Sequence, residues 1–249
     1  MKKYFLTAYV SVFFLILSGF STLRSQASLD LETGIVFTGY NDVRIPGDQG
    51  TLFSLNKDLS ASARIFYRIR AGYTIGTRHN LSLLYAPLNV KSQGIVQRDI
   101  TFEGVVFPAN SSLKGTYKFN SYRLTYRYDI IEKPRFEFGL GITAKIRDAK
   151  ITLASSGLAS EKTNVGFVPI INFMLAWKTG EKLSIVLDGD ALAAPQGRAE
   201  DIQVALNYRL SEKVGLRAGY RILEGGADND EVYNFALFNY ASVGLTLFL

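Results

Sequence analysis

The chain ends with residues 239–249, NYASVGLTLFL, and this stretch decides how the rest of the sequence is interpreted. Apolar residues occupy every second position, at Ala241, Val243, Leu245, Leu247 and Leu249. A period of two is that of a β-strand, so the stretch predicts a strand with one wholly apolar face. Because chain ends fray unless something holds them, this face needs a lasting apolar neighbour.

The first 27 residues have the order of a secretory signal peptide. Lys2 and Lys3 precede an apolar run over residues 4–20, and the small-residue site Ser25-Gln26-Ala27 follows. We predict cleavage after Ala27 and a mature chain over residues 28–249. The alternative is an uncleaved membrane anchor, because the run approaches the shortest length that spans a bilayer. The cleavage site, and the strand-like sequence directly after it, favour the signal peptide.

The composition excludes several classes of site and partner. With no cysteine and one histidine, the chain cannot form cysteine-ligated metal centres or histidine clusters. An exported chain meets an oxidising compartment, yet this fold does not depend on disulfides. The leader holds three of the basic residues and no acid, so the mature chain has a net charge of 6 − 3 = +3. That charge is too small to predict a nucleic-acid partner.

The period of two recurs through the mature chain and predicts about ten strands. In residues 61–73, for example, Ile65 and Tyr67 share one face while Arg64 and Arg68 share the other. The expected strands cover residues 28–40, 61–73, 80–89, 116–130, 135–147, 165–178, 183–191, 201–210, 214–223 and 232–249. Most have one apolar face and one face with more charges than a protein core accepts.

The links between these strands alternate in length. Short links rich in turn residues cover residues 74–79, 131–134, 179–182 and 211–213. Longer links cover residues 41–60, 90–115, 148–164 and 224–231, and the link over residues 193–200 is intermediate. This parity is typical of a membrane barrel with short periplasmic turns and long outer loops. The sequence therefore predicts an all-β fold, a transmembrane antiparallel up-and-down barrel whose last strand pairs with its first.

These features together resemble the small single-chain outer-membrane β-barrel proteins of Gram-negative bacteria, with an OmpA-like, OmpW-like or porin-like architecture. The resemblance covers the whole mature chain and implies one barrel domain over residues 28–249. It also implies a monomer in the bacterial outer membrane, in contact with membrane lipids, lipopolysaccharide and the barrel assembly machinery. Such chains often end on phenylalanine, whereas here Phe248 is penultimate, which weakens the expected recognition by that machinery. Pro169 lies inside a strand and predicts a bulge or a later strand start.

Charged residues are expected to line the lumen, with basic residues toward one side and acids toward the other. The inward residues by parity are Arg64, Arg68, Arg70, Arg123, Arg127, Lys145, Asp188, Asp190, Arg217 and Arg221. One interpretation is a network of ion pairs that plugs the narrow bore, and we favour it because pairing avoids the cost of bare buried ions. The other interpretation is a narrow polar channel.

Two acidic stretches are candidates for chemistry. The catalytic candidates are Asp188, Asp190, Asp201 and Glu224. The metal-binding candidates at the outer rim are Glu224, Asp228, Asp230 and Glu231. Their oxygens suit Ca²⁺ or Mg²⁺, including ions that bridge lipopolysaccharide phosphates, although the spacing is not that of an EF-hand. The alternative is a solvated hairpin loop whose Gly and Asn residues satisfy the turn geometry, and we favour that interpretation.

The functional prediction is a non-enzymatic structural or surface-interaction protein with a plugged lumen and no resident cofactor. His79 lies in a short periplasmic turn, which disfavours enzymes of this architecture that use a histidine on the outer side. A metal-dependent enzyme that modifies lipid A or lipopolysaccharide is the first alternative, and a narrow polar channel is the second. The apolar segment ITFEGVVFP, residues 100–108, raises the question of a lid over the barrel mouth.

Overall fold

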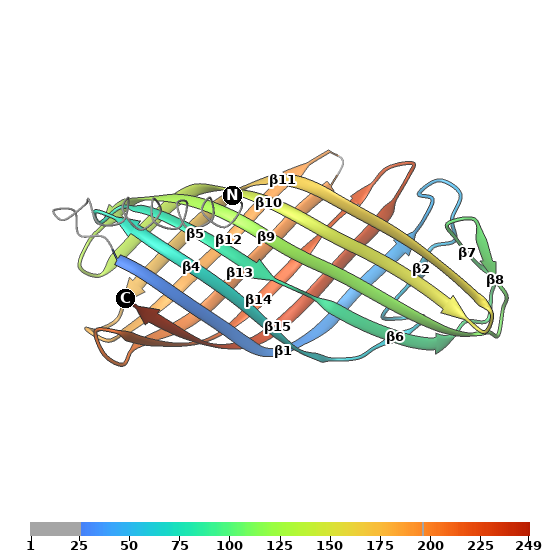
Figure 1. The fold of residues 1–249 in the computed structure, drawn as a ribbon, viewed down its shortest axis with the longest axis horizontal. Helices are drawn as coiled ribbons and strands as arrows, with labels where there is room; N and C mark the ends of the chain where they lie inside the picture. The colour runs from blue at the N-terminus through green and yellow to red at the C-terminus, as the bar shows by residue number, and fades with distance from the viewer. Residues whose placement is uncertain (1–25, 196) are drawn as a thin grey trace, which may run out of the picture.

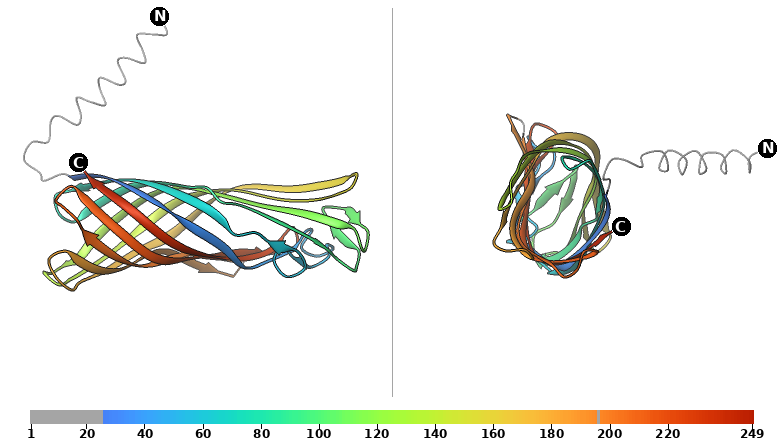
Figure 2. Two further views of the ribbon diagram at one scale, coloured as in Figure 1. Left: turned by 90° about the horizontal axis from the view of Figure 1, so that it is seen from below. Right: turned by 90° about the vertical axis from the view of Figure 1, so that its left-hand side faces the viewer.

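A computed structural model describes residues 26–195 and 197–249, and the predicted signal peptide falls outside them except for Gln26 and Ala27. Ten long strands form the fold: β1 (Gln26–Arg44), β4 (Arg64–Ile75), β5 (His79–Ala86), β9 (Ser112–Glu132), β10 (Phe136–Ser155), β11 (Leu158–Lys178), β12 (Leu183–Ala194), β13 (Gly197–Arg209), β14 (Val214–Asp228) and β15 (Tyr233–Phe248). Each pairs antiparallel with the next, and β15 pairs with β1, so the sheet closes into a barrel. Figure 2 shows the closed ring of strands from one end.

The closing seam joins the two strands that are farthest apart in the sequence. Ser28 lies opposite Phe248, and the register continues along both strands to Arg44 and Tyr233, with one bulge near Tyr40. The prediction that the apolar terminal strand pairs with the first strand is therefore confirmed. Closure leaves no free edge around the central part of the barrel, which is the condition for a sheet in a bilayer.

The two ends of the barrel differ. The C-terminus and the short turns lie at one end, shown on the left in Figure 1, which the turn lengths assign to the periplasm. The opposite, outer end carries the short strands β2 (Phe53–Ser54), β3 (Ser60–Ala61), β6 (Asn89–Ile95), β7 (Ile100–Phe102) and β8 (Val105–Phe107). Among the residues that the structure describes, no helix is long and apolar enough to cross a membrane.

The outer ends of the strands are longer than predicted. The prediction of a long loop over residues 148–164 is wrong, because β10 and β11 stay paired up to Ser155, which lies opposite Leu158. Gly157, in the tight turn between them, has φ of +78°, a conformation that glycine adopts without strain. The link before β15 is also a tight turn, since Asp228 lies opposite Tyr233. Two outer connections remain long, over residues 45–63 and 87–111.

The extra strand length has a physical reason, which is visible along β10. In the lower half, Ile142 faces outward and is 69% exposed, while Lys145 faces inward and is buried. Farther out the pattern inverts, and Ile151 and Leu153 face inward while Lys150 is outward. Where lipid surrounds the barrel, apolar side chains such as Ile142 face outward. Where water surrounds it, charged side chains such as Lys150 face outward and the apolar side chains pack inside. The inversion marks the outer boundary of the lipid-facing band.

The interior of the outer half is an apolar core formed by the loops. Phe53 of β2 packs edge-on against Phe102 of β7, with 6.1 Å between ring centroids, and both side chains are buried. Ile100 and Phe107 pair in the β7–β8 hairpin and belong to the same core. The segment 100–107 thus packs over the outer end of the barrel, as Figure 1 shows on the right.

Pro169 causes neither a bulge nor a late strand start, so that prediction is wrong. It lies opposite Ala144 in an unbroken β10–β11 register. On its other side, the β11–β12 ladder begins only at Ile171 opposite Ala191. The missing N–H of Pro169 therefore costs no ladder bond toward β12, which is how proline is tolerated at a strand edge.

Candidate functional site

The centre of the lumen holds a network of buried ion pairs, joined by Asp201 of β13. Its Oδ2 lies 2.6 Å from Nη2 of Arg123 and 3.1 Å from Nη2 of Arg68. Its Oδ1 lies 2.5 Å from Nη1 of Arg221. The second carboxylate on Arg123 is Asp190, with Oδ2 2.6 Å from Nη1. All five side chains are buried.

Glu32 of β1 completes the network, and it lies opposite Arg68 in the β1–β4 ladder. Its Oε2 lies 3.0 Å from Nη2 of Arg221 and 3.7 Å from Nε of Arg68. Gln203 bridges the same region, since its Nε2 donates to Glu32 and its Oε1 accepts from Arg221. Buried ions of this kind are tolerable only when each has partners that replace its water.

Further ion pairs surround this centre. Arg70 pairs with Asp188 at 3.3 Å, Arg217 with Asp30 at 2.7 Å, and Arg127 with Asp129 at 3.0 Å. These pairs are partly buried. Arg64, also predicted to face the lumen, is exposed. The structure thus brings most of the predicted inward charges into contact across the bore.

Cavities lie above and below the network. A cavity of about 300 Å³ at the periplasmic end is lined by residues that include Thr246 and Phe248 of β15. A second cavity, of about 130 Å³, lies in the outer half and is lined by Ala236 and Phe238 of the same strand. Ser242, which accepts a hydrogen bond from Gln203, lies between them. The network therefore separates two water-accessible spaces.

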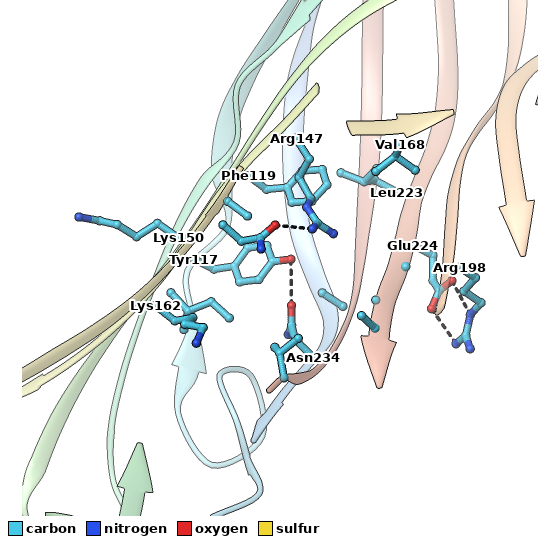
Figure 3. Close-up of a pocket in the computed structure, with 18 of the residues that line it drawn as sticks. Tyr117, Phe119, Arg147, Lys150, Lys162, Val168, Arg198, Leu223, Glu224 and Asn234 are labelled. Atoms are coloured by element: carbon cyan, nitrogen blue, oxygen red, sulfur yellow. Dashed lines mark hydrogen bonds and ion pairs between the residues drawn. The ribbon is translucent and has the colours of Figure 1, made fainter. Parts of the chain in front are cut away.

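The outer cavity combines aromatic walls with basic groups. Figure 3 shows Tyr117 and Phe119 of β9 on one side and Leu223 on the other. Arg147 of β10 reaches between them, and its Nη2 donates to Oδ1 of Asn164 at 2.5 Å. Lys145, one inward position below Arg147, also lines the cavity.

Sequence reasoning missed the aromatic wall of this cavity. Tyr117 and Phe119 have the parity of Arg123 in β9, so they face the lumen. Phe238 has the parity of Ser242 in β15 and is likewise inward. The signal is present in the alternation, because these aromatic residues share the parity of the inward charged residues on their strands.

The predicted acidic candidates are dispersed. Asp188, Asp190 and Asp201 are each paired with arginine, as described above. Glu224 of β14 accepts two hydrogen bonds from Arg198 and one from Tyr40. A metal-dependent enzyme would need such carboxylates free for the ion.

The other rim candidates lie around the turn between β14 and β15. Asp228, Asp230 and Glu231 are exposed there, and Asn229 accepts hydrogen bonds from the amides of Glu231 and Val232. Within residues 26–195 and 197–249, no group of three or more acidic or histidine side chains is arranged to hold a metal ion. The rim cation site therefore stays a prediction.

His79 lies at the periplasmic end of the barrel, which agrees with its predicted place in a short periplasmic turn. It is the first residue of β5, and its Nδ1 lies 2.9 Å from the hydroxyl of Tyr126. Its ring also packs against Tyr128, with 5.1 Å between centroids. The contact with two tyrosines near the end of the lipid-facing band fits an aromatic girdle.

Comparison with known proteins supports the class that this geometry defines. The outer membrane protease OmpT from Escherichia coli is 10% identical, with a TM-score of 0.55 over 92% of this chain and 99% of its own. An outer membrane channel from Pseudomonas putida F1 is 10% identical, with a TM-score of 0.42 over 93% of this chain and 98% of its own. Ail, the attachment invasion locus protein of Yersinia pestis, is 10% identical, with a TM-score of 0.38 over 90% of this chain and 99% of its own. No protein-family model and no curated protein matches the chain.

The protein is a bacterial outer-membrane β-barrel. Its ten-stranded closed sheet has the fold of these proteins, and its outward apolar band suits their location. A shared fold does not determine what a protein does. The function of this chain is therefore argued from its own residues.

Proposed function

We propose that this protein is a non-conducting barrel that acts as a structural and surface-interaction protein in the lipopolysaccharide layer. The observation that carries the proposal is the ion-pair network across the lumen. Arg68, Arg123, Arg221, Glu32 and Asp201 are all buried and bonded to one another. A bore filled by paired side chains has no continuous water path, so transport through it is disfavoured.

The outward surface above the lipid-facing band supports contact with lipopolysaccharide. Lys91 of β6 and Lys114 of β9 are exposed on this surface, and Lys118 and Lys150 lie opposite each other beside them. Lys118 pairs with Asp148 and Lys150 with Glu161, each at 2.7 Å. Among the described residues, Lys91 and Lys114 have no carboxylate within 4.0 Å. Unpaired lysines just above the lipid boundary fit the phosphates of lipopolysaccharide.

Planar-bilayer recording of the refolded full chain tests the closed lumen. We expect no conductance steps above the baseline, because the network lies across the bore. Discrete steps would establish the narrow-channel alternative and contradict the proposal.

Binding to lipopolysaccharide tests the surface. We expect the double variant Lys91→Gln/Lys114→Gln to bind several-fold more weakly and to lose part of the salt dependence, since two cations are removed. Lys133→Gln, in the periplasmic turn between β9 and β10, is the matched control and should bind like the wild type. Equal binding by all three proteins would contradict the surface proposal.

A further inference from the structure

Lys145 differs from the other buried cations of the lumen. It is 3% exposed, yet among the described residues no carboxylate lies within 4.0 Å of its Nζ, and this atom has no hydrogen bond there. Its Nζ lies 4.9 Å from the centroid of the Phe119 ring. The nearby carboxylates of Asp190 and Asp201 are already bonded to Arg123. A buried cation without an anion is costly, which is why such ions are rare unless a partner arrives.

Arg147 is the second cation without a carboxylate, and it lies two residues farther out on the same face of β10. Its Nε is buried and has no hydrogen-bond partner within the described part of the chain. Its bond to the neutral Asn164 leaves its charge uncompensated. Figure 3 shows this guanidinium turned into the cavity beside Phe119. Lys145 and Arg147 thus present two positive charges to one space.

Much of the remaining wall is apolar, and its polar part includes Asn234, the exposed Glu231 and the ion pair of Arg198 with Glu224. Phe119, Leu223 and Phe238 line the cavity, and the last two are buried. Its volume of about 130 Å³ is close to that of apolar protein cavities of about 150 Å³ that bind benzene. The cavity therefore suits one small ring or a short stretch of an acyl chain.

A lateral approach to the cavity is built into the sheet. Along β11, residues 158–170 pair with β10 but have no strand on their other side in the described structure. Lys162, Asn164 and Val168 from this segment line the cavity, while Val165 and Phe167 face outward and are exposed. Unpaired backbone at membrane depth is tolerated where it lines a cavity. The edge of β11 therefore provides a side entrance at the outer boundary of the lipid-facing band, where Phe167 lies opposite Ile146.

We propose that the outer cavity is a binding site for an amphipathic anion. Its carboxylate or phosphate lies between Lys145 and Arg147, and its apolar part packs against Phe119, Leu223 and Phe238. The anion supplies the partner that Lys145 and Arg147 lack, since no carboxylate of the described residues forms an ion pair with either side chain. The site goes beyond the proposed function, which requires no ligand inside the barrel.

Calorimetry on the refolded full chain in phosphatidylcholine nanodiscs tests the site, with phenyl phosphate as the anionic probe and benzyl alcohol as its neutral counterpart. We expect phenyl phosphate to bind about tenfold more tightly or better, because charge-assisted hydrogen bonds form only with the anion. Equal binding of the two probes, or no binding of phenyl phosphate, would overturn the proposal.

Lys145→Met separates a ligand site from a structural role. We expect this variant to bind phenyl phosphate about tenfold more weakly and yet to unfold at a higher urea concentration, since it removes an unpaired buried cation. A purely structural lysine would lower the unfolding midpoint when replaced. Lys133→Met, in the periplasmic turn between β9 and β10, is the control and should change neither quantity. Unchanged probe affinity in Lys145→Met would refute the assignment.

Two further measurements define the pocket and the source of the anion. Leu223→Trp fills the cavity without changing its charge, so it should weaken phenyl phosphate binding, and full affinity in this variant would contradict the location. Adding lipid A to the nanodiscs distinguishes two sources of the same chemistry. Competition with phenyl phosphate assigns the site to an outer-leaflet lipid, and its absence assigns it to a free small anion.

Discussion

Arg123 of β9 and Asp201 of β13 meet across the lumen, with 2.6 Å between Nη2 and Oδ2. Asp201 also bonds to Arg68 of β4 and Arg221 of β14, so this one carboxylate connects four strands around the barrel. It is 2% exposed, and each of its oxygens is used. The barrel is therefore held together across its interior as well as around its wall.

Replacing Asp201 with asparagine should destabilise the protein strongly. The variant keeps the shape of the side chain but leaves three buried guanidinium groups short of an anion. Removing one partner of a buried ion pair costs about 3–5 kcal/mol. Urea unfolding in lipid vesicles measures the loss. Asp228→Asn, at the exposed end of β14, is the control and should stay within about 0.5 kcal/mol of the wild type. A small effect at Asp201 would contradict the network.

The lipid-facing band makes a second prediction. Ile142 lies in the middle of the outward apolar face of β10, so Ile142→Arg should cost about 2–4 kcal/mol in a bilayer. Leu158→Arg lies at the tip of the β10–β11 hairpin, beyond the inversion, and should cost almost nothing. Both are measured by unfolding from vesicles. If the two variants lose similar stability, the proposed boundary of the band is in the wrong place.

The same alternation of apolar and polar residues that predicts the barrel also explains why the outer end of β10 was predicted too early. In β10 the outward apolar positions end at Ile146, and the strand was expected to end with them. The strand continues because Ile151 and Leu153 are apolar on the opposite face. The move of the apolar residues from the outward to the inward face marks the outer boundary of the lipid-facing band, and the strand continues past it.

The inward charges followed from parity alone, but their partners did not. Arg123 and Asp201 are 78 residues apart, and their contact depends on the stagger of the closed sheet. No local pattern encodes that stagger. For the same reason, the isolation of Lys145 became visible only when the positions of Asp190 and Asp201 were known.

The orientation of the barrel is tested by single cysteines, since the natural sequence has none. Ser156→Cys, in the tip of the β10–β11 hairpin, should react with a membrane-impermeant maleimide on intact cells. Arg78→Cys, in the turn between β4 and β5, should react only after the outer membrane is permeabilised. The wild type is the unlabelled control. If only Arg78→Cys is labelled on intact cells, the barrel has the opposite orientation to the one assigned here.

The loop over residues 45–63 should loosen in acid. Arg98 donates to both oxygens of Asp58, with 2.9 Å between Nη2 and Oδ2, and the amide of Ser54 donates to the same side chain. Burial alone would raise the pKa of Asp58, but these hydrogen bonds outweigh it and hold the pKa below its ordinary value. The folded loop therefore favours the charged carboxylate. Its contribution is fully present above the ordinary pKa of about 4 and is lost as the pH falls through the lower, folded value.

Because the Arg98 side chain is about half exposed, solvent screens the pair, and we expect a loss of about 0.2–1 kcal/mol. Hydrogen exchange of residues 53–59 measures it, after correction for the intrinsic pH dependence of exchange. Protection should stay constant near neutral pH and fall below about pH 4. Asp58→Asn is the control, because asparagine retains the shape but does not titrate, so its protection should be lower at neutral pH and flat in acid. The same acid loss in both proteins would show that another group opens the loop.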